Sequence, residues 1–165
     1  MTAPVPQTLP LDVAMQQAVA HHQAGRLSEA EDIYRAILQA LPGNPDANHN
    51  LGLLACQVGQ HAGGLPHLKA ALEANPAHEQ YSLSYAGALL ATGHADEALN
   101  ILQAAMRRGI DSPAIRALLQ KTGAAVPGSA AKGEAPAPAE IDRLVGRATL
   151  HLASVWMSRS MRRVR

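Results

Sequence analysis

Over the first two thirds of the chain, apolar residues recur three and four positions apart, which is the spacing of amphipathic helices. One such run begins after Asn44 and Pro45, which suit the cap and the first turn of a helix, and ends at Gly59. Its apolar members are Leu51, Leu54, Ala55 and Val58. The pattern therefore predicts a helix between Pro45 and Gly59.

Two similar stripes predict further helices. Ser28 and Glu31 have the spacing of a capping box, and the stripe that follows them ends at Pro42. This stripe consists of Ile33, Tyr34, Ile37, Leu38 and Leu41. Asp96 is the predicted cap of another helix, whose apolar residues are Leu99, Ile101, Leu102 and Met106.

Several unusual residues return at a separation of 34 positions, which indicates an internal repeat. Glycine does so at Gly25, Gly59 and Gly93, and proline at Pro42 and Pro76. Two series of small residues keep the same period: Ala18, Gly52, Ala86 and Ala30, Gly64, Ala98. Large residues follow it at Tyr34, Leu68 and Leu102. Each period is thus predicted to form two helices, whose small residues let the axes approach while the large ones fill the remaining space.

A helix-turn-helix unit of 34 residues with this placement of Gly, Ala, Tyr and Pro resembles the tetratricopeptide repeat, over roughly Leu11 to Arg108. The resemblance implies an all-α fold, namely a right-handed helical-hairpin solenoid of three repeats at 11–44, 45–78 and 79–112. Ser112 and Pro113 have the pattern of a helix cap, and we predict that the helix they begin, 113–122, caps the solenoid; the alternative is the first helix of an incomplete fourth repeat. The repeat domain would then span 11–123, after a disordered N-terminus at 1–10.

The sequence departs from the family pattern at three places. Gly64 stands where Ala is usual, and we expect it to cost up to about 1 kcal/mol of helix propensity. The third unit ends in Gly109-Ile110-Asp111 instead of a proline turn. Large residues that the family often has early in the first helix are replaced by Ala14, Asn48 and Ser82.

Charge divides the chain into two parts, although the formal net charge is only +1. Up to Asp142 there are 8 Lys and Arg against 13 Asp and Glu, whereas the remainder has 6 Arg and no acid. Residues 124–140 are rich in Ala, Pro and Gly and are predicted to be a flexible or polyproline-like linker. An acidic body is thus followed by a basic tail, residues 141–165.

The tail has the pattern of a basic amphipathic helix. Its apolar stripe is Ile141, Leu144, Val145, Ala148, Leu152, Val155 and Trp156, and the opposite side carries Arg143, Arg147, His151 and Arg162. Such a segment can contact an anionic membrane or nucleic acid, dock on the repeat body or a partner, or be a truncated or frame-altered end without function. Nucleic acid is the least expected of these, because aromatic interleaving is absent and the body is acidic. Membrane contact is not favoured either.

Composition argues against several classes of protein. With 2% aromatic residues and no Phe, the chain lacks most of what a sheet needs. No apolar run approaches the roughly 20 residues of a membrane span, and the N-terminus lacks the features of a secretory signal. A single Cys56 cannot form an internal disulfide, so we expect a cytoplasmic protein.

Enzyme chemistry is not expected either. His21 and His22 are adjacent instead of one helical turn apart, while His49 and Cys56 are separated by about 10 Å along a helix, too far to share one metal ion. Cys56 has no obvious activating partner in the sequence. We therefore predict no catalytic residue, no cofactor and no metal site.

The resemblance implies a binding surface instead, because the first helices of such repeats line a groove that receives a peptide or a partner helix. The residues assigned to it are Met15, Val19, His22, Gln23, His49, Asn50, Leu53, Cys56, Gln57, Gln80, Leu83 and Leu90. This lining is apolar and amide-bearing and lacks the cations with which chaperone-binding relatives clamp a terminal carboxylate. We predict a protein or peptide ligand with an apolar face, and leave self-association through the end helices open.

A second, local resemblance concerns the runs NPDANHNLGLLA and LKAALEANPAH. They look like the repeats that precede the catalytic region in bacterial relatives of the protein O-linked N-acetylglucosamine transferases. In that group an Asn before the Leu-Gly pair recurs along the groove, and here only Asn50 matches, with Gln16 and Ser84 at the equivalent places. The alternative interpretation is therefore a substrate-presenting N-terminal part separated from its transferase.

Overall fold

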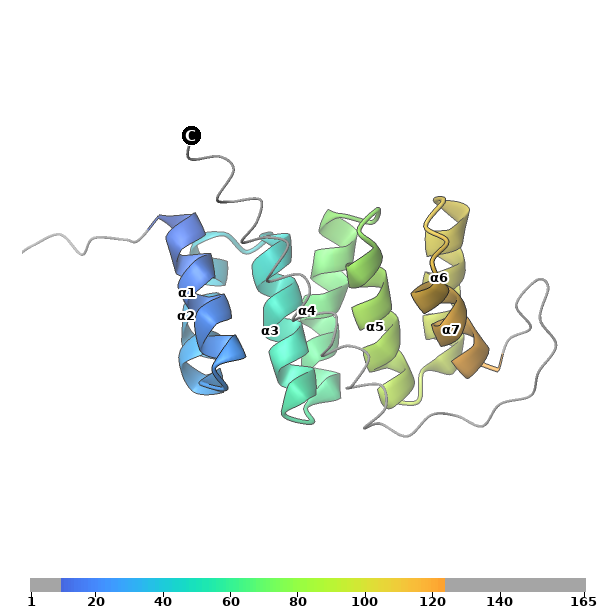
Figure 1. Cartoon of the computed structure of the whole chain (residues 1–165), viewed down its shortest axis with the longest axis horizontal. Helices are drawn as coiled ribbons and strands as arrows, with labels where there is room; N and C mark the ends of the chain where they lie inside the picture. The colour runs from blue at the N-terminus through green and yellow to red at the C-terminus, as the bar shows by residue number, and fades with distance from the viewer. Residues whose placement is uncertain (1–9, 124–165) are drawn as a thin grey trace, which may run out of the picture.

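A computed structural model describes residues 10–123, and within this range it contains seven α-helices and no strand (Figure 1). They are α1 Leu11–Gln23, α2 Leu27–Ala40, α3 Pro45–Gln57, α4 His61–Ala74, α5 Glu79–Ala91, α6 Ala95–Arg107 and α7 Pro113–Lys121. The all-helical fold class is therefore confirmed. The predicted N-terminal disorder up to residue 9, the linker 124–140 and the basic tail 141–165 lie outside the described residues.

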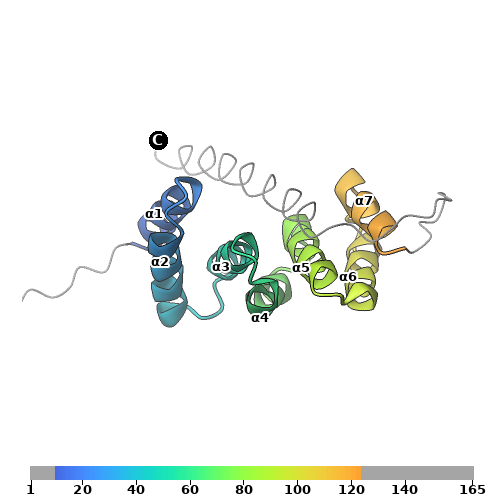
Figure 2. The same ribbon diagram turned by 90° about the horizontal axis from the view of Figure 1, so that it is seen from below.

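The helices repeat with the period of the sequence. The odd-numbered helices begin at Leu11, Pro45, Glu79 and Pro113, each 34 residues after the last, and the even-numbered ones begin at Leu27, His61 and Ala95. Consecutive helices pair as antiparallel hairpins, which stand side by side in one row (Figure 1). Seen along the helices, α1, α3, α5 and α7 lie on one side of the row and α2, α4 and α6 on the other (Figure 2).

Two of the predicted helix caps are confirmed, and two are wrong. The Ala47 N–H donates to Asn44 Oδ1 at 2.8 Å, and the Ile115 N–H donates to Ser112 Oγ at 3.2 Å. Ser28 and Asp96 do not cap their helices, because α2 begins at Leu27 and α6 at Ala95. A tight turn at a glycine with positive φ precedes each of these helices, so the chain re-enters the helical conformation before it reaches the predicted cap.

The third hairpin ends without proline because glycine takes over the turn. Gly109 has φ +85°, and the Ile110 N–H donates to the Ala105 carbonyl at 3.1 Å, across the end of α6. This is the bond pattern of a glycine-terminated helix, which satisfies a carbonyl that the helix leaves unpaired. The departure from the family pattern is therefore structurally accommodated.

The core forms two clusters that meet at α3. One joins α1, α2 and α3 around Tyr34, while the other extends from α3 to α7 around Leu68 and Leu102. These three large side chains, one on each second helix, are completely buried. Leu51 and Leu54 on α3 belong to the first cluster and Leu53 to the second, so α3 links the repeats through opposite faces.

The closest helix contact lies between α3 and α4, where glycines face each other. A Cβ built at Gly64 would lie 2.7 Å from the Gly52 carbonyl oxygen, and one at Gly52 would lie 2.6 Å from Leu68 Cγ. Neither position has room for a methyl group unless the helices move apart. The predicted close approach of the two helices at their small residues is therefore confirmed here, and it explains why glycine stands at Gly64 in spite of its cost in helix propensity.

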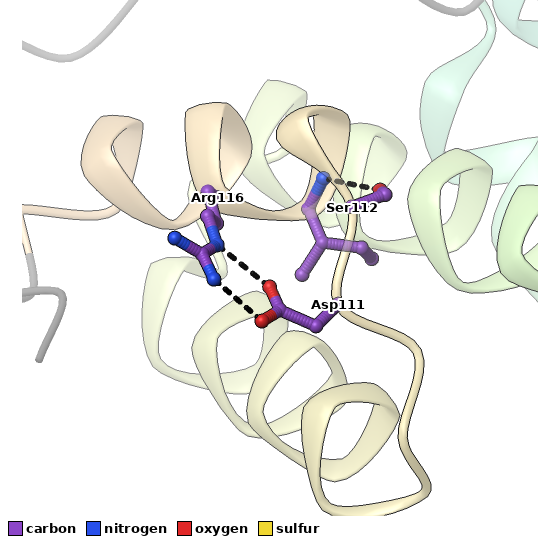
Figure 3. Close-up of polar contacts among 4 residues, drawn as sticks. Asp111, Ser112 and Arg116 are labelled. Carbon is purple, nitrogen blue, oxygen red and sulfur yellow. Dashed lines mark hydrogen bonds and ion pairs between the residues drawn. The ribbon is translucent and has the colours of Figure 1, made fainter.

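Helix α7 covers the apolar end of the third repeat. Ile115, Leu118 and Leu119 are buried against α5 and α6, while no large apolar residue of α7 is exposed: its exposed residues are Pro113, Ala114, Arg116, Ala117 and Gln120. Its start is fixed by Asp111, which accepts hydrogen bonds from Nε and Nη2 of Arg116 at 2.7 and 2.6 Å (Figure 3). The Ser112 hydroxyl also donates to Glu79, which ties α7 to the first turn of α5. These features suit a terminal, solvating helix.

Candidate functional site

All twelve residues predicted to bind a ligand lie on α1, α3 and α5. These three helices stand on the same side of the row, and the row bends so that they lie on the inside of the bend (Figure 2). We call the surface formed by α1, α3 and α5 the inner face. The fold thus brings residues from three separate parts of the sequence to one surface.

The twelve residues differ in how much surface they present. Met15, His49, Leu53 and Cys56 are buried, with exposed fractions of 7%, 3%, 3% and 4%. The half-buried ones are Val19, His22, Asn50, Gln80, Leu83 and Leu90, and the exposed ones are Gln23 and Gln57. The accessible part of the predicted site is therefore apolar and amide-bearing, and its ligand-binding role stays a prediction.

Cys56 packs between α3 and α4. Its Sγ would lie 3.1 Å from a Cβ built at Gly64, so the thiol occupies the space that the missing side chain leaves. It is also a member of the larger core cluster. This position gives Cys56 a role in helix packing, and its assignment to the ligand-binding groove stays a prediction.

Three side-chain hydrogen bonds connect the first helix of one repeat to the first helix of the next. His22 Nε2 lies 2.8 Å from Gln57 Oε1, and His49 Nε2 lies 2.9 Å from Ser84 Oγ. The Tyr81 hydroxyl donates to Asp46 Oδ1 at 2.5 Å. Each pair is separated by 35 residues, one period plus one, so the bonds fix the register between neighbouring repeats.

The sequence predictions for this surface do not include Asp46 or Tyr81, and they name Ser84 only as the position equivalent to Asn50. A search for complementary polar residues 35 positions apart would have found the three pairs. A search at a separation of 34 residues compares equivalent positions of two repeats and does not find these pairs. The residues that bond between adjacent repeats are 35 positions apart, one more than the period.

His49 is a neutral residue at the centre of this network. Burial is the main cause, and the neighbouring His78 a smaller one, of a pKa of His49 that is lowered to about 3. Its ring lies 4.8 Å from the ring of Tyr81, on which His78 stacks at 4.0 Å. Burial also lowers the pKa of His22, while its hydrogen bond to Gln57 opposes this shift. At neutral pH neither His22 nor His49 supplies a positive charge to the inner face.

The remaining charges on the inner face are negative. The helices α1, α3 and α5 contain Asp12, Asp46 and Glu79, each in the first two positions of its helix, and no Lys or Arg. The even-numbered helices carry Arg35, Lys69 and Arg107 instead. Carboxylates at helix N-termini are favoured by the helix dipole, so this row of acids is stable without cationic partners.

The described part of the chain offers no metal site built from three or more His, Cys, Asp or Glu side chains. Within the same part, no helix has the length and apolar character needed to cross a membrane.

Comparison with known families agrees with the period of the helices. Two family models, both described as tetratricopeptide repeat, match this chain, one over residues 11–54 and the other over 55–122. Residues 11–122 are tetratricopeptide repeats. The second match includes α7, whose start continues the 34-residue spacing. Comparison with curated protein sequences finds no match.

Solved structures of such repeats are similar to this chain. The TPR domain of Sgt2 from Aspergillus fumigatus is 20% identical, with 82% of this chain and 95% of that chain covered and a TM-score of 0.61. The first TPR of Spaghetti (RPAP3), bound to the HSP90 peptide SRMEEVD, is 18% identical over 68% and 89% of the two chains, with a TM-score of 0.63. A point mutant of MamA is 22% identical over 72% and 69%, with a TM-score of 0.61. At these identities the likeness shows the fold.

The similarity to transferase repeats stays a prediction. Asn50 is half-buried on α3, and the equivalent Ser84 on α5 is hydrogen-bonded to His49 and Gln80. Ser84 thus contributes to repeat packing, so these two equivalent positions do not form an amide ladder.

Proposed function

We propose that this chain is a protein-interaction scaffold, without catalysis of its own, whose inner face binds a peptide or a partner helix with an apolar face. The observation that carries the proposal is the composition of that surface. Val19, Leu83 and Leu90 are partly exposed on it, and the three helices that form it contain no Lys or Arg. The similar tetratricopeptide structures support a role in protein interaction.

The charge of the inner face determines which ligands it favours. A carboxylate-rich peptide would meet Asp12, Asp46 and Glu79 and no side-chain cation, so repulsion would oppose its binding. A helix with apolar residues on one side and basic residues on the other would match both the apolar surface and the acids. The amides of Gln23, Gln57 and Gln80 can donate and accept hydrogen bonds to its polar groups.

The proposal is tested with a labelled helical peptide of about 18 residues, five turns, carrying Leu on one face and Lys on the other. Fluorescence anisotropy with the full chain should show saturable binding of this peptide and none of SRMEEVD. Val19→Glu and Leu83→Glu, which place a carboxylate in the apolar surface, should each weaken binding at least about tenfold.

Leu41→Glu is the matched control, because Leu41 is 46% exposed in the turn between α2 and α3 and belongs to none of the three inner helices. It should bind the peptide as the unaltered chain does. Equal affinity in all variants, or tighter binding of SRMEEVD than of the Leu/Lys peptide, would contradict the proposal.

The absence of catalysis is proposed separately. Incubation of the full chain with a nucleotide-sugar donor and an acceptor protein should give no transfer above the protein-free control. Reproducible turnover would instead favour the transferase interpretation.

A further inference from the structure

The chain itself contains a segment with the chemistry that the inner face favours. We propose that residues 141–165 bind as a helix on the inner face of α1, α3 and α5, and compete there with the external partner. This inference rests on the proposed function, because it names an occupant for the same surface.

Charge complementarity is the first argument. Asp12, Asp46 and Glu79 begin the three inner helices, which run in the same direction, so their carboxylates form a row along one edge of the inner face. The segment after Asp142 contains six Arg and no acid. Asp46 and Glu79 each accept a hydrogen bond from a neutral hydroxyl, of Tyr81 and Ser112 respectively, and such a donor brings no positive charge. An arginine can bind such a carboxylate in addition to the existing donor.

The apolar pattern of the segment is the second argument. From Ile141 to Trp156 it has seven apolar residues at helical spacing, which would form a stripe about 24 Å long. Amphipathic helices bind in grooves by placing such a stripe against the apolar surface of the groove. Val19 on α1 and Leu83 and Leu90 on α5 offer partly exposed apolar surface at separate points of the inner face.

The distance along the chain also permits this contact. Residues 124–140 connect the segment to α7, which packs directly against α5. In the flexible conformation, one of the two that its composition predicts, a linker of 17 residues has a root-mean-square span of about 20–25 Å. Tethering over such a length gives an effective concentration on the order of millimolar, so even a weak site would be largely occupied by the segment of its own chain.

Trp156 is the single tryptophan and therefore reports on the segment directly. In the full chain we expect its emission to be blue-shifted and its acrylamide quenching at least twofold weaker than in Val19→Glu and Leu83→Glu. Leu41→Glu should match the unaltered chain, and circular dichroism identifies any variant that fails to fold. The protection should be independent of chain concentration and decrease at high salt.

A variant of the segment gives a second readout. Leu152→Glu, which interrupts the apolar stripe, should raise the affinity for the Leu/Lys peptide at least about tenfold, because it removes the internal competitor. If the unaltered chain and Leu152→Glu bind the peptide equally, and Trp156 is equally quenched in all variants, this inference is overturned while the proposed function stands. If neither chain binds the peptide, the proposed function fails.

Two other occupants would also overturn the inference. Protection of Trp156 that grows with chain concentration would mean that a second copy receives the segment. A blue shift that appears only with phosphatidylserine vesicles, and equally in Val19→Glu, would mean that the segment binds membranes instead of the inner face.

Discussion

Two neighbouring glycines on α4 should respond to alanine in opposite directions. A Cβ at Gly64 would lie 2.7 Å from the Gly52 carbonyl oxygen, whereas one at Gly63 would have only Gln60 near it, at 3.9 Å. Gly64→Ala should lower the free energy of unfolding by about 1–3 kcal/mol through overpacking. Gly63→Ala should raise it by about 0.5–1 kcal/mol through helix propensity. Urea unfolding measures both, and stabilisation by Gly64→Ala would refute the close approach of α3 and α4.

Two of the three buried tyrosines, Tyr34 and Tyr81, form a second matched pair. Tyr34 is completely buried and its hydroxyl has no hydrogen-bond partner within the described residues, whereas the Tyr81 hydroxyl donates to Asp46. Tyr34→Phe should leave the free energy of unfolding unchanged or raise it by up to about 1 kcal/mol, since it removes an unsatisfied polar group. Tyr81→Phe should lower it by about 1.5–3 kcal/mol. Thermal unfolding that ranks the two variants the other way would disprove this assignment of the hydroxyls.

Histidine burial makes stability depend on pH. The pKa of folded His49 is about 3, below its ordinary value of 6.5, so the unfolded chain binds more protons between these values. Stability is therefore full above pH 6.5 and falls as the pH drops, by up to about 1.4 kcal/mol per unit from His49 alone. The lowered pKa values of His22, His67 and His78 act in the same direction. His49→Gln should flatten the profile from about pH 7.5 to 5, and an unchanged slope would exclude His49 as its source.

At the scale of the helix, the corrected caps give a direct comparison. Ser112 accepts the Ile115 N–H and donates to Glu79, while Ser28 is exposed within the first turn of α2 and caps nothing. Ser112→Ala should cost about 1–2 kcal/mol and loosen α7. Ser28→Ala should change the free energy of unfolding by less than about 0.5 kcal/mol. If Ser28→Ala and Ser112→Ala lowered the free energy of unfolding equally in chemical denaturation, Ser28 would be a helix cap as the sequence predicted.

The helices were predictable because each depends on a local pattern that recurs. The period of 34 and the series of Tyr34, Leu68 and Leu102 indicated the hairpins and their cores, and all three side chains are buried. The first residues of α2 and α6 were not predicted correctly. Turns at Gly25 and Gly93, which have positive φ, determine where these helices begin, and this outweighs the preference of Ser28 and Asp96 for the cap position. Helix α4 also continues through Pro66, which sequence rules would place at a helix boundary.

At the scale of the whole molecule, the twelve candidate residues lie on the first helices of the three repeats, as the 34-residue period predicts, and the fold puts these helices on one side. It did not predict which of them are buried, since this depends on contacts between repeats. The bonds of His22 to Gln57 and of His49 to Ser84 join residues 35 positions apart, and Cys56 turns toward Gly64 only because α3 and α4 approach so closely. These are long-range consequences of packing that no local pattern contains.

The two proposals are connected by charge, because α1, α3 and α5 contain acids and no Lys or Arg, while the segment after Asp142 contains Arg and no acid. Both proposals require that the ligand contacts α1, α3 and α5 and makes no contact with the outer helices α2, α4 and α6. A two-dimensional ¹H–¹⁵N spectrum of the Leu152→Glu chain, titrated with the Leu/Lys peptide, tests this most directly. We predict shifts at Val19, Gln57 and Leu83, with Arg35 and Lys69 on the outer helices unchanged. Shifts confined to α2, α4 and α6 would contradict the account.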